Sequence, residues 1–189
     1  MEIFKWKEKW IIMEKRITKV IQKNLPQIEK ELNKRFINLK TAMGGGYKKL
    51  STKLKSELLS NLIETSIEEC VVDMIAPKAD DKSDLVFELK RTLEIKTTAG
   101  TDSWRGGEFS KRPGDYLMVG WEEVNGELKL FILHTYLEES DWKSSGSNNY
   151  YATTMDLTTI TETKPYKIIK GGLIKKRIKT HMDKTFINA

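Results

Sequence analysis

The segment Ser83–Lys96 constrains the fold more than any other part of this chain, because its apolar and charged residues alternate. Successive side chains of a β-strand point to opposite faces, so alternation over this length indicates strands. Apolar residues occupy odd positions and charged residues even ones: Leu85, Phe87, Leu89, Leu93 and Ile95 against Asp84, Glu88, Glu94 and Lys96. We expect an antiparallel hairpin that turns around residues 90–92. If the turn holds an odd number of residues, Asp84, Glu94 and Lys96 meet on the face opposite the apolar one.

This predicted polar face brings together two carboxylates and one ammonium group. Such a cluster is a poor source of stability, but it suits a divalent cation held near a phosphate. Mg²⁺ takes oxygen ligands and usually only one or two carboxylates from a protein; Asp84 and Glu94 would supply these, and the backbone carbonyl of Ile95 a third oxygen. Mn²⁺ accepts the same ligands and is expected to substitute. Lys96 is a compact point charge that would orient a water or neutralise charge on the phosphate.

The motif formed by Asp84 and, at the end of a hairpin, Glu94-Ile95-Lys96 resembles that of the PD-(D/E)xK nuclease superfamily. Within this superfamily, the chain is similar to a small type II restriction endonuclease. The resemblance implies Mg²⁺-dependent hydrolysis of DNA phosphodiesters, with Asp84, Glu94 and Lys96 as catalytic residues. Family members often carry Pro before the Asp, where this chain has Ser83, so Asp80 and Asp81 stay open as alternatives to Asp84.

A second Glu-x-Lys, Glu88-Leu89-Lys90, lies within the same segment. We prefer Glu94-Ile95-Lys96, because Asp84 is too near Glu88 to leave room for two strands and a turn. The helix expected before the hairpin also carries Glu64, and some nucleases of this group add a Glu from that helix to the metal site. An exposed helix charge is the alternative for Glu64.

Charge and cysteine content narrow the class of protein. The chain carries 33 Lys and Arg against 27 Asp and Glu, a formal charge of +6, which suits a polyanionic partner. Cys70 is the single cysteine, and the two histidines, His134 and His181, are far apart, so we expect neither a disulfide nor a zinc site. The chain has no run of about 18 apolar residues, so no membrane span is predicted. The start of the chain lacks the apolar core of a signal peptide. We therefore expect a cytoplasmic protein.

The order of predicted elements is helices first and then a mixed sheet. Helical spacing covers residues 5–24, Pro26 can begin a second helix, Gly44-Gly45-Gly46 breaks the pattern, and Ser51 can cap a third helix. Further along the chain we expect strands at 116–121, 128–136 and 150–154, a turn at Asn125-Gly126, and a helix capped by Asp156. Residues 97–115 leave room for one short helical crossover.

This order predicts an α/β fold, with a restriction-endonuclease-like mixed β-sheet core flanked by helices and an N-terminal helical part. The length suits a single nuclease domain, 1–189, with the helical part at 1–46 and the catalytic core with its DNA-reading loops at 47–189.

Two polar loops are candidates for DNA contact. The first, residues 100–112, mixes hydroxyls, an aromatic ring, glycines and basic side chains that can read guanine or approach phosphates. Its candidate residues are Ser103, Trp104, Arg105, Ser110, Lys111 and Arg112. The second, residues 144–149, offers Asn148 and Asn149, since Asn pairs well with adenine edges. Alternatively both are ordinary surface loops, the first with Trp104 packed on the domain.

Together these patterns favour a type II restriction endonuclease that acts on double-stranded DNA at a short specific site with Mg²⁺. One active site cuts one strand, so a double-strand cut at a palindrome calls for a C2 homodimer. Two alternatives stay open. One is a structure-selective or nicking nuclease of the same superfamily, such as a junction resolvase, and the other is a basic DNA-binding module without catalysis.

Overall fold

The structure of the chain, a computed structural model, describes residues 2–71, 85–86, 92–100, 103–106, 113–144 and 153–172. Within these ranges the fold is mixed α/β, with a helical N-terminal part and a mixed β-sheet. Among the described residues, no helix is both long enough and apolar enough to cross a membrane.

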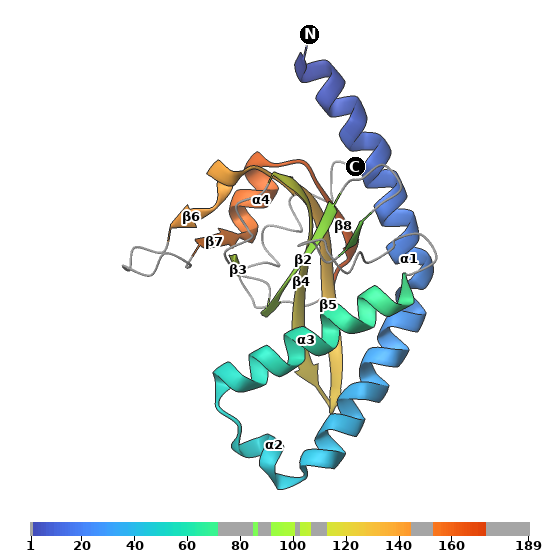
Figure 1. Cartoon of the computed structure of the whole chain (residues 1–189), viewed down its shortest axis with the longest axis vertical. Coiled ribbons are helices and arrows are strands. Elements are labelled where there is room, and N and C mark those ends of the chain that lie inside the picture. Colours follow the sequence, from blue (N-terminus) through green and yellow to red (C-terminus); the bar gives the residue numbers. More distant parts are fainter. Residues whose placement is uncertain are drawn as a thin grey trace.

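The N-terminal part is one long helix, α1 (Glu2–Met43), whose first turns project beyond the sheet in Figure 1. The prediction that Pro26 begins a second helix is wrong, because Pro26 lies inside α1. Proline removes one backbone hydrogen bond and disfavours a helix interior. Burial of Ile21 on one side of Pro26, and of Ile28 and Leu32 on the other, holds both halves of the helix against the sheet and overrides that preference.

Two further helices follow the glycine cluster. Gly44 has φ 52°, a left-handed conformation that glycine adopts without strain, and it ends α1 before the short helix α2 (Gly45–Lys49). Helix α3 (Thr52–Cys70) begins at Ser51, whose hydroxyl accepts a hydrogen bond from the backbone N–H of Leu54 at 3.3 Å. The predicted cap at Ser51 is therefore confirmed, and the helix break predicted at 44–46 is confirmed at Gly44, whereas Gly45 and Gly46 belong to α2.

The main sheet has five strands in the order β1-β2-β4-β5-β8. They are β1 (Leu85–Val86), β2 (Thr92–Ala99), β4 (Gly114–Val124), β5 (Glu127–Leu137) and β8 (Tyr166–Lys170). Strand β2 pairs antiparallel with β1 and parallel with β4, whereas β4–β5 and β5–β8 are antiparallel pairs. The sheet is therefore mixed, as predicted.

Two turns set the register of this sheet. Leu85 pairs with Leu93, so parity carries across the first hairpin as predicted, although Thr92 belongs to β2 rather than to the turn. The β4–β5 hairpin turns at Asn125-Gly126, where φ is 53° and 85°, the positive values that a tight hairpin turn requires.

A smaller sheet, β3-β7-β6, lies beside the main one. It consists of β3 (Ser103–Gly106), β7 (Thr153–Asp156) and β6 (Lys143–Ser144), and the helix α4 (Leu157–Thr163) follows β7. In the part of the β2–β4 connection that the structure describes, strand β3 stands where the prediction placed a helical crossover. Alternation explains the difference, since Trp104 is buried between the exposed residues Ser103 and Arg105. The predicted cap of α4 is confirmed, because the carboxylate of Asp156 accepts a hydrogen bond from the N–H of Thr159 at 2.7 Å.

The two faces of the main sheet pack against different layers (Figure 1). Odd positions of β2 and β4, such as Leu93, Ile95 and Leu117, pack with α1 and α3 in one apolar cluster. The other cluster, on the opposite face, joins Tyr116 and Met118 of β4 to the β3-β7-β6 sheet and α4. Strand β4 is consequently buried on both faces along most of its length.

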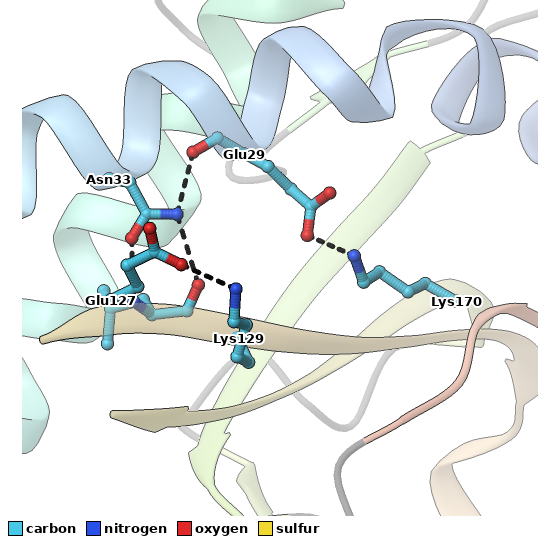
Figure 2. A network of polar contacts seen from close by, with 6 residues as sticks. Glu29, Asn33, Glu127, Lys129 and Lys170 are labelled. Atoms are coloured by element: carbon cyan, nitrogen blue, oxygen red, sulfur yellow. Dashed lines mark hydrogen bonds and ion pairs between the residues drawn. The ribbon is translucent and has the colours of Figure 1, made fainter. Parts of the chain in front are cut away.

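An amide side chain fastens α1 to the main sheet (Figure 2). Strand β8 covers β5 only from Ile132 to Thr135. Near the start of β5, outside this stretch, the side chain of Asn33 accepts a hydrogen bond from the N–H of Leu128 at 2.7 Å and donates one to the Leu128 carbonyl at 3.3 Å. One residue on α1 thus satisfies both main-chain groups of a buried strand residue.

We expect Asn33→Ala to destabilise the protein, because the buried N–H and C=O groups of Leu128 lose their partner. The expected cost is about 1–3 kcal/mol, slightly offset by the higher helix propensity of Ala. The free energy of unfolding from urea denaturation measures it. Glu127→Ala is the control, because the Glu127–Lys129 ion pair beside Leu128 is exposed and its loss should leave the denaturation midpoint unchanged. Equal midpoints for Asn33→Ala and the wild type would contradict the role of the amide.

Candidate functional site

Strand β2 holds Glu94 and Lys96 on the face away from α1 and α3. Alternation places Leu93 and Ile95 in the helix-side cluster, so the two charged residues point to the other side. Register pairs Glu94 with Tyr116 and Lys96 with Met118, and both of these β4 residues belong to the second apolar cluster. A carboxylate and an ammonium group therefore project from β2 next to the apolar side chains of β4.

Glu94 and Lys96 form an ion pair with low exposure. Lys96 Nζ lies 2.5 Å from Glu94 Oε1, and each side chain is only 15% exposed. Removal from water strengthens the attraction but costs desolvation energy, so such a pair is a weak source of stability. It does, however, fix both head groups on a rigid strand. This is the arrangement that the alternation in the sequence predicted for these two residues.

Strand β5 provides an internal comparison, because it carries another Glu-x-Lys, Glu127-Leu128-Lys129. Lys129 Nζ lies 2.6 Å from Glu127 Oε2, almost the same geometry, but the side chains are about half exposed. The hydrogen bond from Lys129 lowers the pKa of the Glu127 carboxyl below its usual value. The same spacing thus forms an ion pair at exposed positions of a strand as well. What distinguishes Glu94 and Lys96 is their low exposure beside the second apolar cluster.

Several predicted residues lie outside the described part of the chain. Asp84 and its alternatives Asp80 and Asp81 belong to this group, as do Glu88 and Lys90 of the second Glu-x-Lys. The same holds for the loop candidates Ser110, Lys111, Arg112, Asn148 and Asn149. Their roles stay predictions.

Glu64 is a half-buried residue of α3, one helical turn after Ser60. The described residues contain no group of three or more His, Cys, Asp and Glu side chains that could hold a metal. The role of Glu64 as a metal ligand also stays a prediction.

A pocket of about 920 Å³ opens where β2 ends. We call it the α3–β3 pocket, because its walls are the first half of α3, the end of β2 and strand β3. Six hydroxyl-bearing residues line it, namely Thr52, Ser56, Ser60, Thr97, Thr98 and Ser103. Its charged residues are Lys53, Glu57 and Arg105. The first residue of β2 in this lining, Thr97, directly follows Lys96.

Hydrogen bonds hold two walls of the α3–β3 pocket in place. Thr97 Oγ1 donates to Ser60 Oγ at 2.5 Å and so ties β2 to α3. Trp104, fully buried in the second apolar cluster, donates from Nε1 to the Val119 carbonyl at 3.0 Å and ties β3 to β4. The flanking residues Ser103 and Arg105 are exposed and line the pocket. We therefore remove Trp104 from the candidate DNA contacts, because its indole packs in the core.

A buried acid–histidine pair lies on the helix-covered face of the sheet. His134 Nε2 is 2.9 Å from Asp115 Oδ1, and both side chains are almost completely buried. It links β4 to β5 beneath the helices, on the face opposite Glu94. The sequence analysis did not predict this pairing. Asp115 alternates in step with Leu117 of β4, and His134 with Ile132 of β5, and both of these apolar residues face α1 and α3.

Comparison with known proteins gives no relative: no protein-family model and no curated protein matches this chain.

We predict that Lys96→Met destabilises the fold, because Glu94 keeps its charge in a nearly buried position without its ammonium partner. The expected loss is about 1–3 kcal/mol. The double variant Glu94→Gln/Lys96→Met should recover part of it, since it removes both charges, and urea denaturation of the four proteins gives the coupling energy. The same cycle at Glu127 and Lys129 is the matched control and should show little coupling. Similar coupling at the two pairs would contradict the importance of burial.

Proposed function

We propose that this protein is a Mg²⁺-dependent endonuclease that hydrolyses phosphodiesters of double-stranded DNA at a short specific site, as type II restriction endonucleases do. The observation that carries the proposal is the Glu94–Lys96 pair, which is held at 15% exposure on β2, two residues before Thr98 of the α3–β3 pocket. A charged pair with so little exposure is more typical of a functional site than of a solvated strand face.

The topology supports the proposal of a restriction-endonuclease-like core. The Glu-x-Lys strand β2 has an antiparallel neighbour from the preceding hairpin, β1, and a parallel neighbour, β4. Helices α1 and α3 precede this sheet and cover one face, as expected from the resemblance. The net charge of +6 suits a polyanionic substrate.

The proposed metal site fits the described residues in part. The carboxylate of Glu94 and the main-chain carbonyl of Ile95 are hard oxygen donors of the kind that Mg²⁺ prefers. Asp84, the second proposed carboxylate, lies outside the described residues. When bound, Mg²⁺ would polarise the phosphodiester and lower the pKa of a water.

The side chains themselves have separate proposed roles. Lys96 holds a fixed positive charge where a phosphate would lie, so it orients the attacking water and offsets the negative charge that develops on the phosphate. Glu94 repels the phosphate until a cation compensates the negative charge of the carboxylate. Since one chain would carry one such site, cleavage of both strands requires two chains, and we propose a C2 homodimer.

Plasmid cleavage tests the proposal. Glu94→Gln and Lys96→Met should each lower the cleavage rate about 100-fold or more, because each removes a group that acts at the reacting phosphate. Glu127→Gln and Lys129→Met, which change the exposed Glu-x-Lys pair, should cut at the wild-type rate. Thermal unfolding checks that the variants are folded.

The products also separate the alternatives. Discrete linear fragments support a restriction endonuclease, whereas nicks or cuts at junctions support a structure-selective nuclease. A gel shift without any cutting supports a DNA-binding module. If Glu88→Gln and Lys90→Met abolish cutting while Glu94→Gln and Lys96→Met do not, the other Glu-x-Lys is the site.

The metal requirement gives a further prediction. Cleavage should stop in excess EDTA and return with Mg²⁺ or Mn²⁺, because both accept the same oxygen ligands. Ca²⁺ should support tight DNA binding without cutting, since its larger radius and looser geometry would misplace the attacking water. Gel shifts in Ca²⁺, followed by addition of Mg²⁺, measure both steps. Undiminished cleavage in EDTA would refute the roles of Asp84 and Glu94.

A further inference from the structure

The lining of the α3–β3 pocket has the chemistry of an anion site. Six of its lining residues carry hydroxyl groups, and all of these except Thr97, whose hydroxyl donates to Ser60, can donate a hydrogen bond to a phosphate oxygen. Two cations, Lys53 and Arg105, face one carboxylate, Glu57. Lys53 Nζ lies 3.9 Å from Glu57 Oε1 in a loose, exposed contact, so the lysine stays available to another anion. The balance of charge in the pocket is positive.

The arrangement of the walls adds to this preference. Thr52 and Lys53 belong to the first turn of α3, a 19-residue helix, so the positive end of its dipole lies at the pocket. Arg105 approaches from β3 on another side, and its guanidinium is exposed. The cations therefore stand on separate elements, which suits an extended anion that passes between them better than a small ion bound at one point.

The position of the pocket relates it to the Glu94–Lys96 pair. Thr98 shares a face of β2 with Lys96 and lies two residues on, about 7 Å along the strand. A chain of phosphates that placed one group at Lys96 would place neighbouring groups at the pocket, since a DNA strand carries one charge about every 3.4 Å of its axis.

We propose that the α3–β3 pocket holds the phosphodiester backbone of a DNA strand beside the phosphate that is cut, with Arg105 and Lys53 as the clamping cations. The identification of the polymer as DNA rests on the proposed function. The pocket assigns Arg105 to the backbone rather than to guanine reading, the other role that the sequence left open for the basic side chains of residues 100–112. It also adds Lys53 and Ser56, which no sequence motif indicated.

DNA binding without cleavage tests the proposal. Full-length protein with Glu94→Gln, in Ca²⁺, is titrated with fluorescent duplexes of several unrelated sequences at a series of salt concentrations. Arg105→Met and Lys53→Met should each weaken binding to all duplexes about three- to tenfold and lower the slope of log Kd against log salt by about one unit. Ser56→Ala should weaken binding less and leave the slope unchanged. Lys129→Met removes an exposed lysine outside the pocket and is the matched control.

Three results would overturn the proposal. Unchanged affinity and slope in both Arg105→Met and Lys53→Met would exclude a clamp. A loss confined to one duplex sequence would assign Arg105 to base reading. Loss of inorganic phosphate binding, measured by calorimetry, with wild-type DNA affinity would make the pocket a site for a free anion. Because no cutting is measured, failure here is distinct from failure of the nuclease proposal, which plasmid cleavage tests.

Discussion

The parallel pairing of β2 with β4 is the constraint on which the candidate site depends. Strand β4 has β2 on one side and β5 on the other, so it lies inside the sheet and is covered on both faces. The register of β2 against Asp115–Trp121 of β4 determines which residues of β2 face each of the two apolar clusters. Glu94 and Lys96 consequently lie beside aromatic and apolar side chains rather than in water. A shift of one residue would exchange the two faces and bury Leu93 and Ile95 in the wrong cluster.

The pocket depends on both layers that pack against this sheet. Its helical wall is connected through Ser60 and Thr97, and its strand wall through Trp104 and the carbonyl of Val119. Both contacts attach to neighbouring strands of one rigid ladder, so α3 and β3 are held at a defined separation. Residues far apart in the sequence thus form one concave surface. Layers from both sides of the sheet therefore supply side chains that would contact a ligand in the pocket.

Local signals in the sequence predicted part of this arrangement. Alternation placed Glu94 and Lys96 on one face, and the caps at Ser51 and Asp156 and the turn at Asn125-Gly126 depend only on neighbouring residues. The remaining features depend on distant contacts. The continuity of α1 through Pro26 comes from packing on the sheet, and the formation of strand β3 in the connection from β2 to β4 comes from burial of Trp104. The pairing of Ser60 with Thr97 joins two hydroxyls whose spacing carries no motif.

The two hydrogen bonds between Asn33 and Leu128 also bear on association between copies of this chain. A strand with unpaired N–H and C=O groups along its side is a template for pairing with another chain, and natural proteins cover such sides. Strand β8 covers only one stretch of β5, and Asn33 occupies the main-chain groups of Leu128 beyond it. The side chain therefore protects the protein from intermolecular β-pairing as well as joining helix to sheet. Loss of this amide would favour aggregation at high concentration even under conditions in which the monomer stays folded.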